Sequence, residues 1–319
     1  MIHTSACDVL GIEHPVIQAG MAGHTNAELV AAVSNAGGLG ILAGFRRSAD
    51  ALVQDVRRVR SLTDRPFGVN FVLHLLNEET FRAALAERIP VFSLYRGDPA
   101  DAVAQAHAVG SLVIDQITTV AEAEYARAVG VDVLVAQGAE AGGHTGLLPL
   151  WNLLPEVVKV AGSRPVLAAG GIVDGQGLAA ALSFGASGVL MGTRFLATPE
   201  SPATPAHKQA ILAAQLGDTV ASPMLDILRG EDWPGIQVRT FRNPLTARWA
   251  GHEAELRSAV AEVRAEQERA RAAGDDSLTI RLAGEGVARI HDLKPAGQIV
   301  RDTVAEAEQI LQKLNSQID

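Results

Sequence analysis

The segment Gly138–Gly146 combines a glycine-rich backbone with one imidazole, that of His144. It directly follows the apolar run Val131–Gln137, whose composition is typical of a buried parallel strand. Because glycine has no Cβ and tolerates positive φ, such a loop lets the backbone approach a ligand closely. Histidine is the side chain best suited to move a proton near neutral pH. The segment therefore predicts a docking surface with one candidate acid–base group.

Two further pairs of small residues follow apolar runs, Gly170-Gly171 and Gly192-Thr193. They offer exposed N–H groups and one hydroxyl, which suit a phosphate where they follow the seventh and eighth strands of a barrel. Each pair on its own also fits a plain tight turn. The sequence has no Gly-Lys-Ser/Thr stretch of the Walker type, so it does not indicate a nucleoside triphosphate.

Polar residues mark several of the other predicted strand ends, among them Asn70 and Gln116. Asn70 is a candidate ligand contact, and a hydrogen bond to backbone in a turn is its plain alternative. His24 lies in the loop after the first strand, where an ordinary loop histidine is a simpler interpretation than a catalyst. The remaining histidines lack metal-ligand spacing and the acidic residues form no cluster, so we expect no metal site.

Eight apolar runs alternate with amphipathic helical patterns, and Ser48 and Asp174 are suitable N-caps for two of the helices. This alternation implies a parallel sheet with helices outside it. Eight units predict an α/β fold of the closed (β/α)8 TIM barrel type, with an open doubly wound sheet as the alternative. The expected strands are Pro15–Ala19, Leu39–Gly44, Phe67–Leu73, Val91–Tyr95, Ser111–Ile117, Val131–Gln137, Pro165–Gly170 and Gly188–Thr193. The expected helices are Asn26–Ala36, Ser48–Leu62, Asn77–Arg88, Pro99–Val109, Val120–Val129, Leu150–Ala161 and Gln176–Phe184.

The alternation stops after Thr193, and we predict three parts. Residues 1–211 form the barrel, 212–293 a small helical subdomain over its C-terminal mouth, and 294–319 a helix that returns to the barrel. Within the second part, Glu253–Ala273 carries Arg and Glu at i,i+4 spacing, as solvated helices do.

The composition limits which classes of protein the chain can belong to. With 319 residues and 48% hydrophobic content, the chain is ample for a large core. A net charge of −9, without a basic patch interleaved with aromatics, argues against nucleic acid as a partner. No apolar run is long enough to span a membrane, and the N-terminus lacks the pattern of a signal peptide. The single cysteine, Cys7, can form no internal disulfide, so we expect a cytoplasmic enzyme.

Several short motifs follow one another along the predicted barrel, between residues 15 and 195. On these motifs the chain resembles the nitronate monooxygenase family, formerly called 2-nitropropane dioxygenases, which are FMN-dependent (β/α)8 barrels. Flavin-dependent enoyl-ACP reductases and NADH:quinone reductases share most of the same motifs. The matching segments are Pro15–Ala22, Gly37–Gly40, Gly68–Asn70, Gln137–His144, Ala169–Ile172 and Gly188–Phe195.

The resemblance implies FMN as the cofactor and His144 as the catalytic base that faces it. It implies contacts to the flavin from the loop after the first strand, from polar side chains and from the glycine-rich loop. The residues that would contact the flavin are Gly20, Met21, Ala22, Asn70, Gln116, Gln137, Gly142 and Gly143. Those that would hold its phosphate are Gly170, Gly171, Gly192 and Thr193.

The implied reaction is the oxidation of a nitroalkane or alkyl nitronate with O2 to a carbonyl compound and nitrite. In it, His144 would remove the α-proton of the neutral nitroalkane. The chain departs from one common form of the pattern, because Thr145 stands where many relatives have arginine. That difference removes a cation near an anionic substrate and bears on which substrate is used more than on the cofactor.

Two alternatives stay open. The first is an NAD(P)H-dependent flavin reductase of the same fold, acting on a quinone or an enoyl thioester. Arg239, Arg242 and Arg248 could offer it a nucleotide site, although surface arginines are usually just solvated. The second is a non-catalytic, flavin-binding regulatory barrel, which would need no imidazole at His144. The expected partners are a small-molecule substrate and O2, and the composition is compatible with a homo-oligomer.

Overall fold

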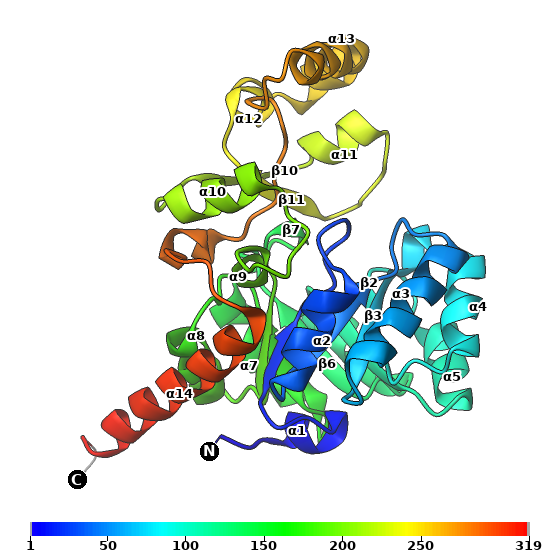
Figure 1. Cartoon of the computed structure of the whole chain (residues 1–319), viewed down its shortest axis with the longest axis vertical. Coiled ribbons are helices and arrows are strands. Elements are labelled where there is room, and N and C mark those ends of the chain that lie inside the picture. The colour runs from blue at the N-terminus through cyan, green and yellow to red at the C-terminus, as the bar shows by residue number, and fades with distance from the viewer. Residues whose placement is uncertain (1, 318–319) are drawn as a thin grey trace.

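A closed barrel of eight parallel strands forms the centre of the protein, seen here in a computed structural model that describes residues 2–317 (Figure 1). Each strand is hydrogen-bonded to the next barrel strand along the chain, and the last pairs with the first. This confirms the predicted TIM barrel and excludes the open sheet. The barrel strands are β1 (Val16–Gln18), β2 (Leu39–Ala43), β3 (Phe67–Val72), β4 (Val91–Tyr95), β5 (Leu112–Ile117), β6 (Val133–Gln137), β8 (Val166–Ala169) and β9 (Gly188–Met191).

A helix lies in every crossover between barrel strands, at the place where the sequence predicts it. The two predicted N-caps form: Ser48 accepts a hydrogen bond from the N–H of Ala51, and Asp174 from that of Gly177. The crossover helices are α2 (Ala27–Asn35), α3 (Ala49–Leu62), α4 (Glu78–Ala86), α5 (Ala100–Ala108), α6 (Val120–Ala128), α7 (Leu150–Ala161) and α8 (Gly175–Ser183).

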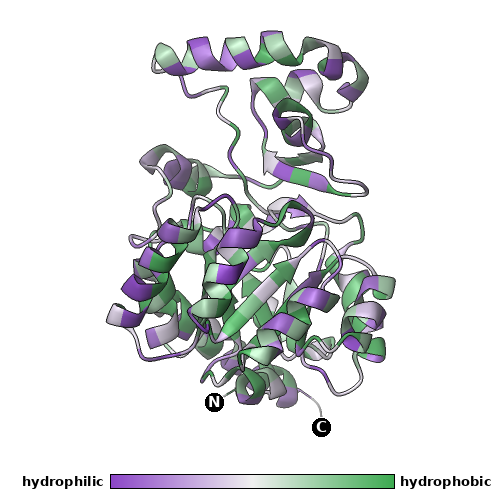
Figure 2. Cartoon of the chain, turned by 90° about the vertical axis from the view of Figure 1, so that its right-hand side faces the viewer, coloured by the Kyte–Doolittle hydropathy of each residue, from purple (hydrophilic) through white to green (hydrophobic). Residues whose placement is uncertain are grey.

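The barrel strands are buried along almost their whole length, because helices cover the outer face and side chains fill the interior. One hydrophobic cluster fills the barrel, and a larger one lies between strands and helices. Figure 2 shows apolar strands inside and polar helix faces outside. A short helix that the sequence did not predict, α1 (Ser5–Leu10), adds Cys7 and Leu10 to the interior cluster. This packing fixes the strand ends from which the loops emerge.

Residues 199–293 form a second layer over the carboxyl-terminal ends of the strands, which we call the cap (Figure 1). The predicted small helical subdomain also contains a sheet, because two strands of the cap pair antiparallel. The long charged helix is present as predicted. The elements of the cap are α10 (Pro205–Ala213), β10 (Thr219–Ser222), α11 (Met224–Arg229), β11 (Gln237–Phe241), α12 (Pro244–Trp249), α13 (Glu253–Ala272) and η2 (Glu285–Arg289).

A third strand, β7 (Gly143–Thr145), completes the sheet of the cap and comes from the loop after β6. It pairs antiparallel with β11, with His144 opposite Val238. The sequence predicted a loop throughout this segment. It becomes a strand because β11 supplies hydrogen-bond partners from a distant part of the chain. The barrel and the cap are therefore joined by a shared sheet at the segment that carries the candidate acid–base group.

The final helix, α14 (Ala296–Asn315), returns to the outside of the barrel and packs beside α8 and α2, as the sequence predicted (Figure 1). Its buried face includes Ile299, Val300 and Val304. The exact limits of the three predicted parts stay predictions. Among residues 2–317, no helix combines the length and the apolar character needed to cross a bilayer.

Arg239 on β11 holds the glycine-rich loop in place through the backbone of Ala139. Its guanidinium donates two hydrogen bonds to the carbonyl oxygen of Ala139, at 3.0 and 2.9 Å, and one to the hydroxyl of Thr219. It also forms an ion pair with Glu285 at 2.8 Å. Its side chain is only 11% exposed, so Arg239 is neither a solvated surface arginine nor free to form the nucleotide site that the reductase alternative considered.

We predict that Arg239→Met lowers the free energy of unfolding by about 2–3 kcal/mol. The substitution keeps an unbranched stem but leaves the Ala139 carbonyl oxygen unpaired and removes charge-assisted hydrogen bonds. Urea denaturation followed by circular dichroism measures the effect. Arg242→Met, on an exposed side chain of the same strand end, is the control and should stay within about 0.5 kcal/mol of wild type. Equal effects of the two substitutions would contradict the role assigned to Arg239.

Candidate active site

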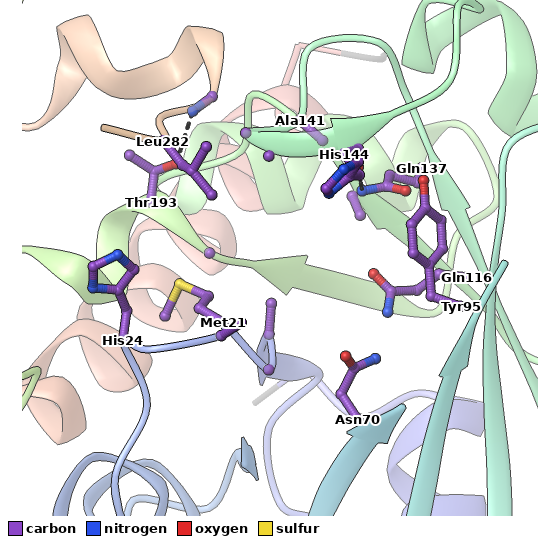
Figure 3. A pocket seen from close by; sticks show the side chains of 18 of the residues that line it. Met21, His24, Asn70, Tyr95, Gln116, Gln137, Ala141, His144, Thr193 and Leu282 are labelled. Atoms are coloured by element: carbon purple, nitrogen blue, oxygen red, sulfur yellow. Dashed lines mark hydrogen bonds between the residues drawn. The ribbon is translucent and has the colours of Figure 1, made fainter. Parts of the chain in front are cut away.

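A cavity of about 470 Å³ opens between the carboxyl-terminal strand ends and the cap (Figure 3). Its lining includes every residue that the resemblance implies as a flavin or phosphate contact or as the catalytic base. These residues are Gly20, Met21, Ala22, Asn70, Gln116, Gln137, Gly142, Gly143, His144, Gly170, Gly171, Gly192 and Thr193. Arg239, Arg242 and Arg248, in contrast, do not line the cavity. The structure thus brings the implied contacts and His144 together, while their roles toward a ligand stay predictions.

Asn70 stands at the end of β3 on the floor of the cavity (Figure 3). Its Nδ2 donates to the carbonyl oxygen of Ser93 at 3.2 Å. Asn70 therefore forms a hydrogen bond to the backbone, which was the alternative to a ligand contact, and it also lines the cavity. Nδ2 also donates to the hydroxyl of Ser93 at 3.4 Å, which leaves Oδ1 of the amide for a ligand. The loop after β1 passes directly over this side chain, because a Cβ at Gly20 would lie 2.6 Å from the Cβ of Asn70.

Two buried oxygen atoms of cavity-lining residues have no hydrogen-bond partner among the described residues, Oη of Tyr95 and Oε1 of Gln137. The other end of the Gln137 amide is in use, since Nε2 donates to the carbonyl oxygen of His144 at 3.2 Å. Burial raises the pKa of Tyr95, so its phenol stays neutral and keeps its proton. Buried polar groups are rarely left unpaired, so the two atoms indicate a missing polar ligand.

The opposite end of the cavity is formed by backbone and small side chains. Gly170 and Gly171 both have positive φ, 116° and 68°, and their N–H groups donate to nothing within residues 2–317. The hydroxyl oxygen of Thr193 accepts a hydrogen bond from the N–H of Gly284 at 2.9 Å, which leaves the hydroxyl proton to be donated. These donors suit an anionic group such as a phosphate.

His144 lies on the cavity wall nearest the cap. Its Nε2 lies 2.9 Å from Oδ1 of Asp226, whose side chain is 4% exposed. The indole of Trp233 stacks on the imidazole, with ring centroids 3.6 Å apart and an interplanar angle of 20°. One edge and one face of the ring are thereby fixed, and the ring is held at a defined place beside the cavity.

The shared sheet explains how Asp226 reaches His144 from 82 positions away in sequence. His144 is paired with Val238, and Val238 with Ser222 at the end of β10, so the three form one row across the sheet. Side chains in one row point to the same face. Helix α11 begins directly after Ser222 and folds back over that face, which brings Asp226 to the imidazole.

Sequence reasoning missed Asp226, Trp233 and Tyr95. A signal for Asp226 exists: it is a lone carboxylate inside the apolar run Met224–Leu228, and a charge in a buried segment needs a partner. The identity of that partner depends on the pairing of β7 with β11, which no local pattern indicates.

Three arginines that the sequence analysis did not name line the rim of the cavity, Arg46, Arg47 and Arg229. Arg46 is paired with Glu231 and Arg47 with Asp55. Arg229, on α11, forms no ion pair within the part of the chain that the structure describes, and burial with the nearby charge of Arg46 lowers its pKa. Of these three arginines, Arg229 is therefore the one whose charge is not balanced by an ion pair and that can attract an entering anion.

Thr145 is fully buried and its hydroxyl donates to the carbonyl oxygen of Gly138 at 2.8 Å. The side chain after the histidine therefore closes the base of the glycine-rich loop and does not line the cavity. Gly142, in the same loop, is required by the chain itself, because a Cβ there would lie 2.5 Å from the backbone nitrogen of Gly284. The arginines near the cavity come instead from the segment after β2, which carries Arg46 and Arg47, and from the end of α11, which carries Arg229.

His24 and His207 meet edge to face at the end of the cavity away from His144, with ring centroids 5.2 Å apart. Burial lowers the pKa of both rings, and the charge of His24 contributes to lowering that of His207, to about 4. The carbonyl oxygen of Leu282 lies 3.0 Å from Nε2 of His207 and accepts its hydrogen bond, which offsets only part of the lowering of the pKa. His24 thus lines the cavity without a catalytic partner. Within residues 2–317, no three His, Cys, Asp or Glu side chains gather as a metal site would need.

His207 predicts a loss of stability in mild acid. The unfolded chain binds a proton at an ordinary histidine pKa near 6.5, whereas the folded protein binds it only near pH 4. Stability is therefore highest above pH 6.5 and falls as the pH drops toward 4. We expect His207→Gln to lose about 1 kcal/mol less than wild type per pH unit between pH 6 and 5, in urea denaturation at each pH. His291→Gln, on an exposed ring, is the control and should follow wild type. Identical pH slopes for His207→Gln and wild type would refute this assignment.

Comparison with known proteins places this chain within one class of enzyme. The sequence profile described as nitronate monooxygenase matches residues 3–82 and 77–306. A nitronate monooxygenase of Pseudomonas aeruginosa is 33% identical over 93% of this chain and 97% of its own. A (3aS,4S,5R,7aS)-5-hydroxy-7a-methyl-1-oxo-octahydro-1H-indene-4-carboxyl-CoA dehydrogenase of Mycobacterium tuberculosis is 38% identical over 89% of this chain and 80% of its own. The solved structure of FabK from Thermotoga maritima superposes with a TM-score of 0.89 at 33% identity, over the full length of both chains.

Fold and relatives together define an oxidoreductase built on a TIM barrel, so the chain is an enzyme. It belongs to the nitronate monooxygenase family, and the predicted resemblance is confirmed. The alternative of a non-catalytic barrel is not supported, since the relatives are named for the reactions they catalyse.

Proposed function

We propose that the enzyme is an FMN-dependent nitronate monooxygenase that oxidises nitroalkanes or alkyl nitronates with O2. The observation that carries the proposal is the position of His144, an imidazole paired with a buried carboxylate on the wall of a cavity that also contains an anion-binding end. The family profile and the Pseudomonas aeruginosa relative support the choice of substrate class.

The residues of the cavity fit FMN in three respects. The free N–H groups of Gly170 and Gly171 and the hydroxyl of Thr193 would hold the phosphate. The unpaired atoms of Tyr95 and Gln137 would meet polar atoms of the ligand. Asn70, Gln116 and the loop Gly20–Ala22 would contact the rest of the cofactor. The chemistry that bound FMN supplies is electron transfer from the nitronate to O2, with a carbonyl compound and nitrite as products.

The protein contributes binding and proton transfer. Arg229 at the rim attracts the anionic nitronate or the polar nitro group. His144 takes the α-proton of a neutral nitroalkane, and the carboxylate of Asp226 stabilises the imidazolium that results. A preformed nitronate has already lost that proton, so it requires orientation only. The two substrates therefore depend differently on His144.

The proposal predicts that His144→Asn lowers kcat for nitroethane by about 10²–10⁴-fold, while turnover of ethyl nitronate falls much less. Oxygen uptake and nitrite release measure both substrates. His291→Asn, an exposed histidine, is the control that should behave as wild type. Equal losses on nitroethane and nitronate would exclude His144 as the base, and a wild-type enzyme inactive on both would refute the proposed reaction.

A second prediction concerns the phosphate end of the cavity. Thr193→Val removes the hydroxyl and leaves the shape of the side chain almost unchanged, so we expect the Kd for FMN to rise about tenfold. Fluorescence titration of the apoprotein with FMN measures it. Thr279→Val, on an exposed side chain of the cap, is the matched control. Unchanged affinity in Thr193→Val would move the phosphate away from this residue.

The second candidate is a dehydrogenase or reductase that uses NAD(P)H or a CoA-linked substrate at the same cavity. It is favoured by Arg46, Arg47 and Arg229, which could bind the phosphates of a nucleotide handle, and by the Mycobacterium tuberculosis relative. The visible spectrum of the anaerobic protein separates the two candidates. Rapid bleaching of a flavin spectrum by NADH or NADPH supports the reductase, and its persistence supports nitronate oxidation. Cytoplasmic location, freedom from nucleic-acid partners and homo-oligomer formation stay predictions.

A further inference from the structure

We propose that Asp226 holds His144 as its Nε2–H tautomer, which makes Nδ1 the atom that takes the proton from the substrate carbon. Asp226 is then a positioning residue that the cap contributes to the site of the barrel. The identity of the substrate rests on the proposed function, whereas the tautomer rests on the geometry alone.

The first step of the argument is the polarity of the 2.9 Å contact between Nε2 of His144 and Oδ1 of Asp226. An ionised carboxylate has acceptors only, so the shared proton must belong to Nε2. A neutral imidazole carries one N–H, and Nδ1 is consequently left with a free lone pair. The contact is buried, with the two side chains 14% and 4% exposed, so little water competes for it.

The second step is that the imidazole of His144 is held in the orientation that directs Nε2 at Asp226. Trp233 stacks on one face of the ring at 3.6 Å, and its own Nε1 donates to Glu231. The backbone of His144 is held by pairing with Val238 and by the bond from Gln137 to its carbonyl oxygen. Within residues 2–317, Nδ1 has no hydrogen-bond partner, and the residue lines the cavity (Figure 3).

The third step is the charge balance of the proton transfer. The substrate C–H bond breaks, its proton moves to Nδ1, and its electron pair stays on the substrate as the nitronate. The imidazolium formed then lies against Asp226, whose other oxygen, Oδ2, has no partner among the described residues. The whole carboxylate charge therefore faces the imidazolium, which favours proton uptake.

The tautomer is measured directly by nitrogen NMR of the full-length protein labelled with ¹⁵N-histidine, at pH 8 with the cofactor that it carries as isolated. His144→Asn identifies the resonances of His144. We expect wild type to show a protonated Nε2 and an unprotonated Nδ1 with the shift of a free lone pair. A protonated Nδ1 in wild type overturns the proposal, whatever the substrate is found to be.

Asp226→Asn tests the consequence, because the carboxamide is nearly isosteric, carries no charge and can donate to Nε2. We expect loss of the single tautomer in the NMR spectrum, and a fall in kcat for nitroethane of about 10²–10³-fold with KM changed less than threefold. Turnover of ethyl nitronate should fall less than tenfold. Asp232→Asn, an exposed carboxylate a few residues further on, is the matched control and should match wild type in every readout.

The outcomes separate this inference from the proposed function. Equal losses on nitroethane and nitronate, with the tautomer unchanged, would make Asp226 a structural tie between α11 and β7 and overturn its positioning role. A wild-type enzyme that turns over neither compound refutes the substrate class, and the NMR result then decides the tautomer independently.

Discussion

The pairing of β7 with β11 is the interaction on which the arrangement of the site depends. Three residues of a barrel loop become the edge strand of a sheet that otherwise belongs to the cap. The pairing fixes the backbone of His144, sets the face on which its side chain emerges, and brings α11 over that face. Arg239 lies opposite Gly143 in the same ladder and holds the preceding turn through Ala139. Although its many glycines suggest a flexible loop, the segment Gly138–Gly146 is held in place by hydrogen bonds to a distant part of the chain.

The barrel could be predicted from sequence because each βα unit carries its own signals. An apolar run such as Leu39–Ala43 ends in small residues, and a capping side chain such as Ser48 follows. Helices such as α5 and α6 end just before a glycine of positive φ. These signals act over a few residues and need no knowledge of the rest of the chain. The closure of eight units then follows from counting, and the positions of the loop residues follow from closure.

The sheet of the cap could not be predicted, because its strands depend on contacts between distant segments. Its strands β10 and β11 are short, and each is stable only because it pairs with segments far away in the sequence. Residues 199–243 therefore show no periodicity, and the sheet was interpreted as part of a helical region. The same cause hid Asp226 and Trp233, since their importance comes from contact with His144 and from no pattern of their own. The cofactor-facing candidates lay in local motifs and were all found at the cavity.

The barrel and the cap contribute different residues to the cavity. The loops after β8 and β9 and the polar side chains of β3, β5 and β6 belong to the barrel and surround the cavity from below. Trp233 and Arg229 belong to the cap and line the cavity, and Asp226, also in the cap, contacts His144. A change in the cap can therefore alter the environment of His144 and the charge of the rim, and through Gly284 it can also reach the hydroxyl of Thr193. Because the barrel and the cap are joined by the pairing of β7 with β11, the backbone of His144 keeps its position when other residues of the cap change. One barrel can in this way support different substrates within the family.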